Sequence, residues 1–245
     1  MRQALLIALA ALVTVTAVAF AQTQDNTYSV QGKLSPNRKV GPVGATFNYQ
    51  VGESNGNRPA AVKTYKISFY GVKEHGERFR TCSASSIAAQ KTDRGCKLGA
   101  LVGTGKVISA VGPDNDVTSR PITCTKSLHI WNSGRHKTTL FLYGPASQCG
   151  GVGFVAPIPA KYRSGPGGGS TLVFTVPPSV LHPLTGLTTA VTSTTSKIKR
   201  LVNHGVGYYQ AVRCKGHGRP VTVTFVSEAG QSTPISAPTG TCRNK

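Results

Sequence analysis

Six cysteines are the residues whose type and spacing first indicate chemistry in this 245-residue sequence. They fall into three couples along the chain: Cys82 and Cys96, Cys124 and Cys149, Cys214 and Cys242. Zinc ligation is disfavoured because no Cys-x-x-Cys is present and Cys214-Lys-Gly-His217 lacks a matching second half. Six cysteines allow 15 pairings. We favour pairing within each couple, which makes all six structural disulfides and leaves no cysteine nucleophile.

One glycine-rich segment resembles a phosphate-binding loop but lacks two required residues. In Lys97–Val107, a Walker A motif would need Gly where Ala100 stands and Ser or Thr where Val107 stands. We therefore predict that Gly103 and Gly105 permit close backbone packing or a bulge within a strand.

The segment Gly112–Asp116 suggests calcium, but the EF-hand pattern fails. That pattern needs Glu at the twelfth position, where Thr125 stands, and Gly at the sixth, which is also absent. A Pro-Asp-Asn-Asp turn between strands explains these residues without a metal. The sequence thus predicts no metal site and no cofactor.

Hydrolytic motifs are also missing. No Gly-x-Ser-x-Gly elbow, His-Glu-x-x-His helix or Ser-x-x-Lys set occurs in a convincing context. Among the eight acidic residues, Glu74 and Glu77 lie in the charged segment Lys73–Arg80, where solvated ion pairs explain them. We expect no enzymatic activity. A secreted hydrolase is the least favoured alternative, since a triad is defined by geometry rather than by sequence order.

Positive charge is the strongest overall signal. The chain has 28 Lys and Arg against 8 Asp and Glu, a formal net charge of +20. Such a field attracts polyanions in a salt-dependent way. The clusters are spread along the sequence, which weakens the prediction of a dedicated site, and the charge otherwise keeps an exported domain soluble. The candidate polyanion contacts are Arg78, Arg80, Arg135, Lys137, Lys197, Lys199, Arg200, Arg213, Lys215 and Arg219.

A specific nucleic-acid partner is not expected. The sequence has no helix-turn-helix pattern, no zinc-finger spacing and no RNP-like aromatic motif. Trp131, Tyr143, Tyr208 and Tyr209 are candidates for a sugar-stacking platform. Because neighbouring residues face opposite sides of a strand, we expect one of the two adjacent tyrosines in the core and the other on the surface.

The first 21 residues have the pattern of a secretory signal peptide. Arg2 supplies positive charge, Ala4–Phe20 carries none, and Ala19-Phe20-Ala21 fits a cleavage site before Gln22. An uncleaved N-terminal anchor is the alternative. We predict a secreted or extracellular protein with no integral membrane span after cleavage. Association of the secreted protein with the cell envelope is an alternative within this prediction. Disulfides fit that compartment.

The remaining sequence is a series of short, alternating strands, which predicts an all-β fold. The clearest alternation is in Phe47–Val51, Tyr65–Phe69 and Val221–Phe225. Leu172–Val176 is a further β-rich run, and Leu140–Tyr143 is continuously apolar, as expected of a more central strand. Hairpins are expected at Asn132–Gly134 and Glu228–Gly230, and one short helix at Ser86–Gln90, capped by Ser83. We expect an immunoglobulin-like two-sheet β-sandwich that is stapled by disulfides. The order in which its strands pair is left open.

The Gly-rich segment 164–170 is the one low-complexity stretch. It is a flexible connector by composition. We expect a main β-sandwich part at 22–163 and a C-terminal β part at 171–245, which either stands apart or completes the same sandwich.

A resemblance supports this fold. Thr81-Cys82-Ser83-Ala84, Cys96 and Val102-Gly103-Thr104-Gly105 resemble a group of exported actinobacterial proteins with a Cys-Ser segment, a nearby second Cys and a Val-Gly-Thr-Gly strand. Members tend to end in a β-hairpin bracketed by two cysteines, here Cys214 and Cys242. This chain departs from the group where Lys97 replaces the Pro that often follows the second Cys. The resemblance implies a secreted β-sandwich and no assigned activity.

Three functional hypotheses follow. The first is an exported, non-catalytic structural or interaction protein of the cell envelope or extracellular space. The second is a polyanion-binding module for acidic wall polymers, polysaccharide or extracellular DNA. The third is the secreted hydrolase. Basic side chains clustered on one face of the structure would favour the second hypothesis, and an even scatter would favour the first.

Overall fold

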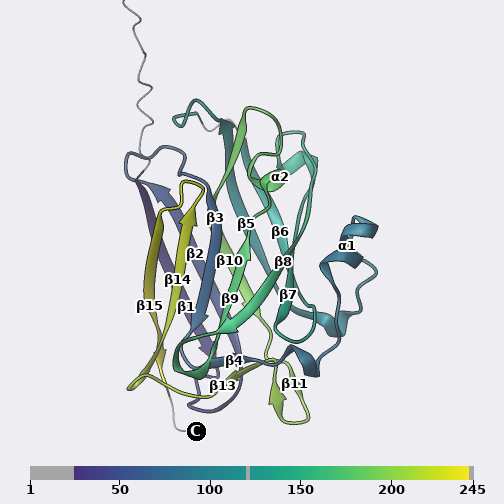
Figure 1. Cartoon of the computed structure of the whole chain (residues 1–245), viewed down its shortest axis with the longest axis vertical. Coiled ribbons are helices and arrows are strands. Elements are labelled where there is room, and N and C mark those ends of the chain that lie inside the picture. Colours follow the sequence, from purple (N-terminus) through teal and green to yellow (C-terminus); the bar gives the residue numbers. More distant parts are fainter. Residues whose placement is uncertain (1–24, 120–121, 243–245) are drawn as a thin grey trace, which may run out of the picture.

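A computed structural model describes residues 25–119 and 122–242 (Figure 1). The predicted signal peptide, residues 1–21, lies outside the described residues. The described chain is mostly strand, in agreement with the predicted all-β class. The strands are β1 (Asn26–Ser35), β2 (Gly41–Glu53), β3 (Val62–Phe69), β4 (Val72–Glu74), β5 (Leu101–Pro113), β6 (Ile122–Asn132), β7 (Lys137–Gly144), β8 (Phe154–Ser164), β9 (Ser170–Thr175), β10 (Leu187–Ile198), β11 (Val202–Asn203), β12 (Val206–Gly207), β13 (Tyr209–Ala211), β14 (Gly218–Ser227) and β15 (Ser232–Thr241).

Thirteen of these strands form one antiparallel sheet in the order β15-β14-β3-β9-β8-β7-β6-β5-β10-β2, with β1 also paired to β2. The short strands β13 and β4 continue from the start of β2, and β11 and β12 form a separate small hairpin. The predicted hairpins are confirmed as β6–β7 and β14–β15.

The sheet curls until its two ends meet. β1 lies beside β15, and Tyr28 of β1 stacks on Phe225 of β14 with ring centroids 4.4 Å apart. The inner face is apolar because alternate residues point inward, as in β14, where Val221, Val223 and Phe225 are fully buried.

The predicted two-sheet, immunoglobulin-like sandwich is therefore wrong in one respect. Hydrogen-bonded ladders join every neighbouring pair from β15 to β2, so the core lies inside one rolled sheet and not between two separate sheets. Alternation of apolar residues shows which side chains face a core, but it does not show which strands pair.

The segment 164–170 forms the connection between two paired strands. Ser164 at the end of β8 faces Ser170 at the start of β9, and a short 3-10 turn, Pro166–Gly168, joins them. Strands from both sides of this segment belong to the same sheet.

The structure has two short helices, α1 (Ala84–Gln90) and α2 (Pro178–Leu181). As predicted, Ser83 caps α1, its Oγ accepting a hydrogen bond from the Ser86 amide at 3.2 Å. Ile87 of α1 packs with Trp131 and Phe141 on the outer face of the sheet. None of the helices in the described part of the chain has the length and apolar character needed to cross a bilayer.

All three predicted disulfides are confirmed. Cys82 pairs with Cys96, Cys124 with Cys149 and Cys214 with Cys242. The first closes the loop that carries α1, and the last ties the loop before β14 to the end of β15. The predicted close packing of Gly103 and Gly105 is also confirmed, because a Cβ on either would collide with the backbone of β10.

Candidate functional site

The antiparallel strand order gathers the loops at two ends of the rolled sheet. At one end, the first residue of β1 pairs with Glu53, the last residue of β2, and β10 begins where β5 finishes. α2 and the β14–β15 turn lie at this same end (Figure 1). Five of the eight acidic residues of the sequence lie here, and we call this the acidic end: Asp25, Glu53, Asp114, Asp116 and Glu228.

The opposite end is strongly basic. It is formed by the turns β1–β2, β6–β7 and β8–β9, the chain after β10, the loop before β14 and the segment from β4 to Arg80. Its exposed cations, which define the basic end, are Arg38, Lys39, Lys73, Arg78, Arg80, Lys97, Arg135, Lys137, Lys161, Arg163, Lys197, Lys199, Arg200, Arg213 and Lys215. Nine of the ten predicted polyanion contacts are in this group, so residues dispersed in sequence are collected at one end in space.

Few acidic side chains lie at this end: Glu74 is buried there, and exposed Glu77 pairs with His75. Among the strands of the large sheet, only β2 and β4 contain a carboxylate residue, Glu53 and Glu74. Ten residues of β1 at about 3.3 Å per residue place the acidic end about 30 Å away. That distance exceeds the Debye length of about 10 Å at 0.1 M salt, so the acidic end barely affects the potential at the basic end.

The densest contact surface follows neighbouring strands on the outer face. Lys137 of β7 lies directly opposite Lys161 of β8, and Arg163 follows two residues later on the same face of β8. Lys161 pairs with Val173 of β9, which in turn pairs with Lys66 of β3. Directly opposed cations repel each other, and a bound polyanion would relieve that repulsion. Sequence analysis missed Lys161 and Arg163, although two cations separated by one residue would face the same side of a strand and were a usable signal.

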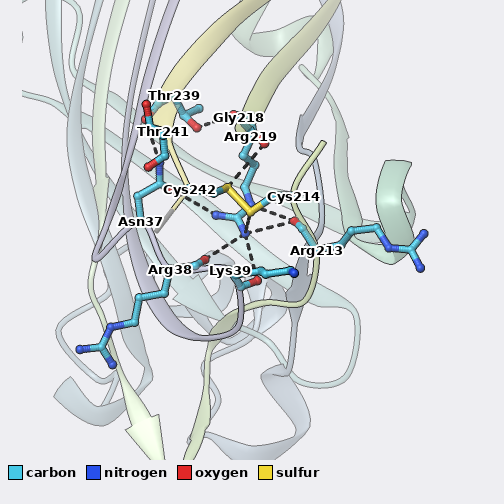
Figure 2. The surroundings of a disulfide bond; sticks show 10 residues. All are labelled: Asn37, Arg38, Lys39, Arg213, Cys214, Gly218, Arg219, Thr239, Thr241 and Cys242. Atoms are coloured by element: carbon cyan, nitrogen blue, oxygen red, sulfur yellow. Dashed lines mark hydrogen bonds between the residues drawn. A yellow bond between two sulfur atoms is a disulfide. The ribbon is translucent and has the colours of Figure 1, made fainter. Parts of the chain in front are cut away.

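Arg219 is the exception among the predicted contacts. It is fully buried, and its guanidinium donates hydrogen bonds to Asn37 Oδ1 at 2.8 Å and to the carbonyls of Arg38 and Arg213, each at 3.1 Å (Figure 2). The prediction that Arg219 contacts a polyanion is therefore wrong. Its position beside the Cys214–Cys242 disulfide lets it fix two basic loops instead, while the side chains of Arg38 and Arg213 extend away from the cluster (Figure 2).

A second buried polar group holds the segment that carries Arg78 and Arg80. Asn132 is fully buried at the end of β6. Its Nδ2 donates to the carbonyls of Gly76 at 2.8 Å, Phe79 at 3.2 Å and Arg80 at 2.9 Å. Because the backbone is fixed at three points, this pair of basic side chains is presented from a defined loop.

Glu74 lies beneath the basic end, and the prediction that it is a solvated ion-pairing residue is wrong. Its side chain is inaccessible to solvent. Oε1 accepts a hydrogen bond from the Gly76 amide at 2.5 Å, and Oε2 lies 3.2 Å from His136 Nδ1. Burial raises the pKa of Glu74 to about 7. Below that pH the carboxyl is therefore largely neutral, and it then subtracts little from the positive charge of the basic end. Glu77, by contrast, is exposed and pairs with His75.

Several histidines of the described chain lie beside a carboxylate, which is one part of a hydrolytic triad. Four histidines among the described residues have a carboxylate partner: His75, His129, His136 and His182. A hydroxyl group also approaches His182, whose Nδ1 lies 3.4 Å from Thr188 Oγ1. That hydroxyl, however, donates its hydrogen bond to Asp114. A nucleophilic hydroxyl would instead donate its hydrogen bond to the histidine that acts as its base.

The predicted sugar-stacking platform is not formed. Trp131 is buried, and Tyr208 and Tyr209 are both buried and stacked on each other. The expected alternation fails because the chain bends at Tyr208, just before β13 begins. Only Tyr143 of the four aromatic residues is exposed.

No cluster of three or more His, Cys, Asp or Glu side chains in the described ranges is arranged to hold a metal ion. Asp116 instead accepts hydrogen bonds from the amides of Thr118 and Ser119, at 2.9 and 3.2 Å, as the predicted turn requires.

Comparisons with known protein families, with curated proteins and with solved structures give no match. The function must therefore be argued from the geometry of the chain itself.

Proposed function

We propose that this chain is an exported, non-catalytic binding protein that attaches to anionic polymers of the cell envelope or extracellular space through its basic end. The observation that carries the proposal is the segregation of charge, because fifteen exposed cations lie at one end and five of the eight acidic residues lie at the other. A distribution made only for solubility would need no such separation.

The chemistry of the basic end suits a flexible polyanion. Lysines and arginines on several loops provide many separate contacts, each of which displaces counterions from the polymer. Three disulfides are typical of proteins from oxidising compartments. The cations lie on several loops rather than on one helix or ribbon that could enter a DNA groove and contact base edges. Phosphate, sulfate or carboxylate groups in a repeating chain are therefore the expected partners.

Binding of fluorescent long-chain polyphosphate to the oxidised 22–245 protein tests the proposal. The test variant is Lys137→Gln with Lys161→Gln, and the matched control is Lys63→Gln with Lys91→Gln, which removes two exposed cations that do not belong to the basic end. Both variants have the same net charge, so the long-range field falls equally in each.

We expect the test variant to bind about tenfold more weakly at 0.1 M salt and its salt slope to fall by about two, one for each lost contact. The control variant should retain the wild-type slope. Equal losses in both variants would show attraction by net charge alone and overturn the proposal, as would a lack of binding at low salt. Retention on isolated cell envelopes over the same salt series extends the test to natural polymers.

A further inference from the structure

The interior of the rolled sheet contains a cavity of about 100 Å³. Most of its wall is apolar and aromatic, and α2 covers it at the acidic end through Val180 and Leu181. An apolar cavity of about 150 Å³ can hold a benzene ring. The volume here therefore suits a ring or chain of about four to six carbon atoms.

One wall of this cavity is polar. Lys126 of β6, Ser109 of β5, and Thr189 and Thr194 of β10 are buried on the inner faces of three neighbouring strands and line it. Tyr65 of β3 lines it as well. The Thr189 hydroxyl has no hydrogen-bond partner within the described part of the chain, whereas the hydroxyls of Thr194 and Tyr65 interact with the Tyr49 hydroxyl. Buried polar groups without partners are rare in native structures, so the Thr189 hydroxyl on the same wall as buried Lys126 indicates a missing ligand.

Lys126 is the unusual member of this wall. Only 1% of its surface is exposed. Its Nζ donates to Ser109 Oγ at 2.8 Å and lies 4.7 Å from the ring centre of Phe154. No salt bridge in the described ranges involves it. Burial lowers its pKa to about 8, which still leaves most of the amine protonated at neutral pH. A buried cation without an anion is strongly disfavoured.

We propose that the cavity binds a small carboxylate with an apolar ring or short chain. The carboxylate is the counter-ion of Lys126 and accepts hydrogen bonds from the hydroxyls of the polar wall, while the apolar part fills the space between the aromatic side chains. A neutral ligand would leave the ammonium unpaired, and a dianion would bring one charge too many into an apolar site. A second hollow of about 30 Å³ is also lined by Lys126 and Thr189 and by Leu184 and Leu187 at the acidic end, and the same proposal takes this hollow as the ligand's path.

Hexanoate and benzoate, compared with hexanol and benzyl alcohol, test this assignment in calorimetric titrations of the oxidised protein. We expect the carboxylates to bind and to raise the thermal midpoint. Lys126→Met keeps the apolar volume but removes the cation. Compared with the wild-type protein, this variant should bind the carboxylates at least about tenfold more weakly and the alcohols equally well. Lys106→Met, an exposed substitution on the outer face of β5, is the matched control and should change neither.

Several results would overturn the assignment: no carboxylate binding to the wild-type protein, equal binding to the Lys126→Met variant, or a preference for the alcohols. Occupation of the cavity by water alone would produce the first of these. A measurement without any variant guards against misfolding of Lys126→Met. In ¹⁵N-lysine-labelled wild-type protein, hexanoate should shift the Lys126 Nζ resonance and leave the exposed lysines unchanged, and an unmoved resonance would refute the contact.

Discussion

Arg219 offers the sharpest test of how the basic end is built. We predict that Arg219→Met lowers the free energy of unfolding by about 4 kcal/mol, although Arg219 pairs with no carboxylate in the described ranges. The guanidinium joins the β1–β2 turn to the loop before β14 through Asn37 and the carbonyls of Arg38 and Arg213 (Figure 2).

The magnitude follows from these contacts. Hydrogen bonds to a charged group contribute about 1.5–3 kcal/mol each. Three such bonds have donor–acceptor distances of 2.8–3.1 Å. Their sum is reduced because removing the side chain also removes a buried cation, whose desolvation lowers the pKa of Arg219. The remainder, about 3–5 kcal/mol, matches the cost of removing one partner from a buried charged network.

Urea denaturation of the disulfide-intact protein measures this difference. A lysine ammonium can replace only part of the guanidinium's fork of donors, so Arg219→Lys should lose about half as much. The control is Arg213→Met, since the Arg213 side chain is exposed and only its carbonyl is used, and it should change stability by less than about 0.5 kcal/mol. A loss below about 1 kcal/mol for Arg219→Met would refute the idea that this buried cation organises the basic loops.

Two further predictions concern the buried carboxyl and the α1 disulfide. Because the pKa of Glu74 is 4.5 in its ordinary state and about 7 when folded, the folded protein binds more protons between these values. Its stability should therefore fall as the pH rises through this window, by up to about 3 kcal/mol. In urea denaturations over this pH range, Glu74→Gln should flatten the fall, exposed Glu77→Gln should not, and an unchanged profile for Glu74→Gln would contradict the burial argument. Replacing both Cys82 and Cys96 by Ser should cost about 3 kcal/mol for a loop of about 15 residues. It should also shift the emission of Trp131, the single tryptophan, to longer wavelength as α1 loosens, whereas an unshifted spectrum would show that Ile87 packing alone holds α1.

Local features of the fold were predictable from the sequence because each depends on neighbouring residues. Alternation gave the inner faces of β3 and β14, Gly and Asn marked the hairpin turns, and Ser83 marked the start of α1. Disulfide pairing was predictable because the closing cysteine of each couple lies near its partner in sequence. Continuous pairing from β15 to β2 was not predictable, since an alternating strand does not specify its neighbours.

The basic end shows the same division between local and distant information. Most of its cations were identified in sequence, but their assembly depends on strand direction, which places every second loop at the same end of an antiparallel sheet. The sequence also could not distinguish Arg219, which is enclosed by a turn 180 residues away, from exposed Arg213. Burial of Glu74 similarly depends on His136, 62 residues along the chain.

The two proposed sites are physically independent. The basic end lies about 30 Å from the acidic end, and the hollow that we infer to be the path to the cavity is lined by Leu184 and Leu187 at the acidic end. A polymer held by the basic loops therefore leaves that path uncovered. Substitutions at Lys137 and Lys161 act on the outer face, whereas Lys126 points into the interior. Failure of one proposal would consequently leave the other untouched.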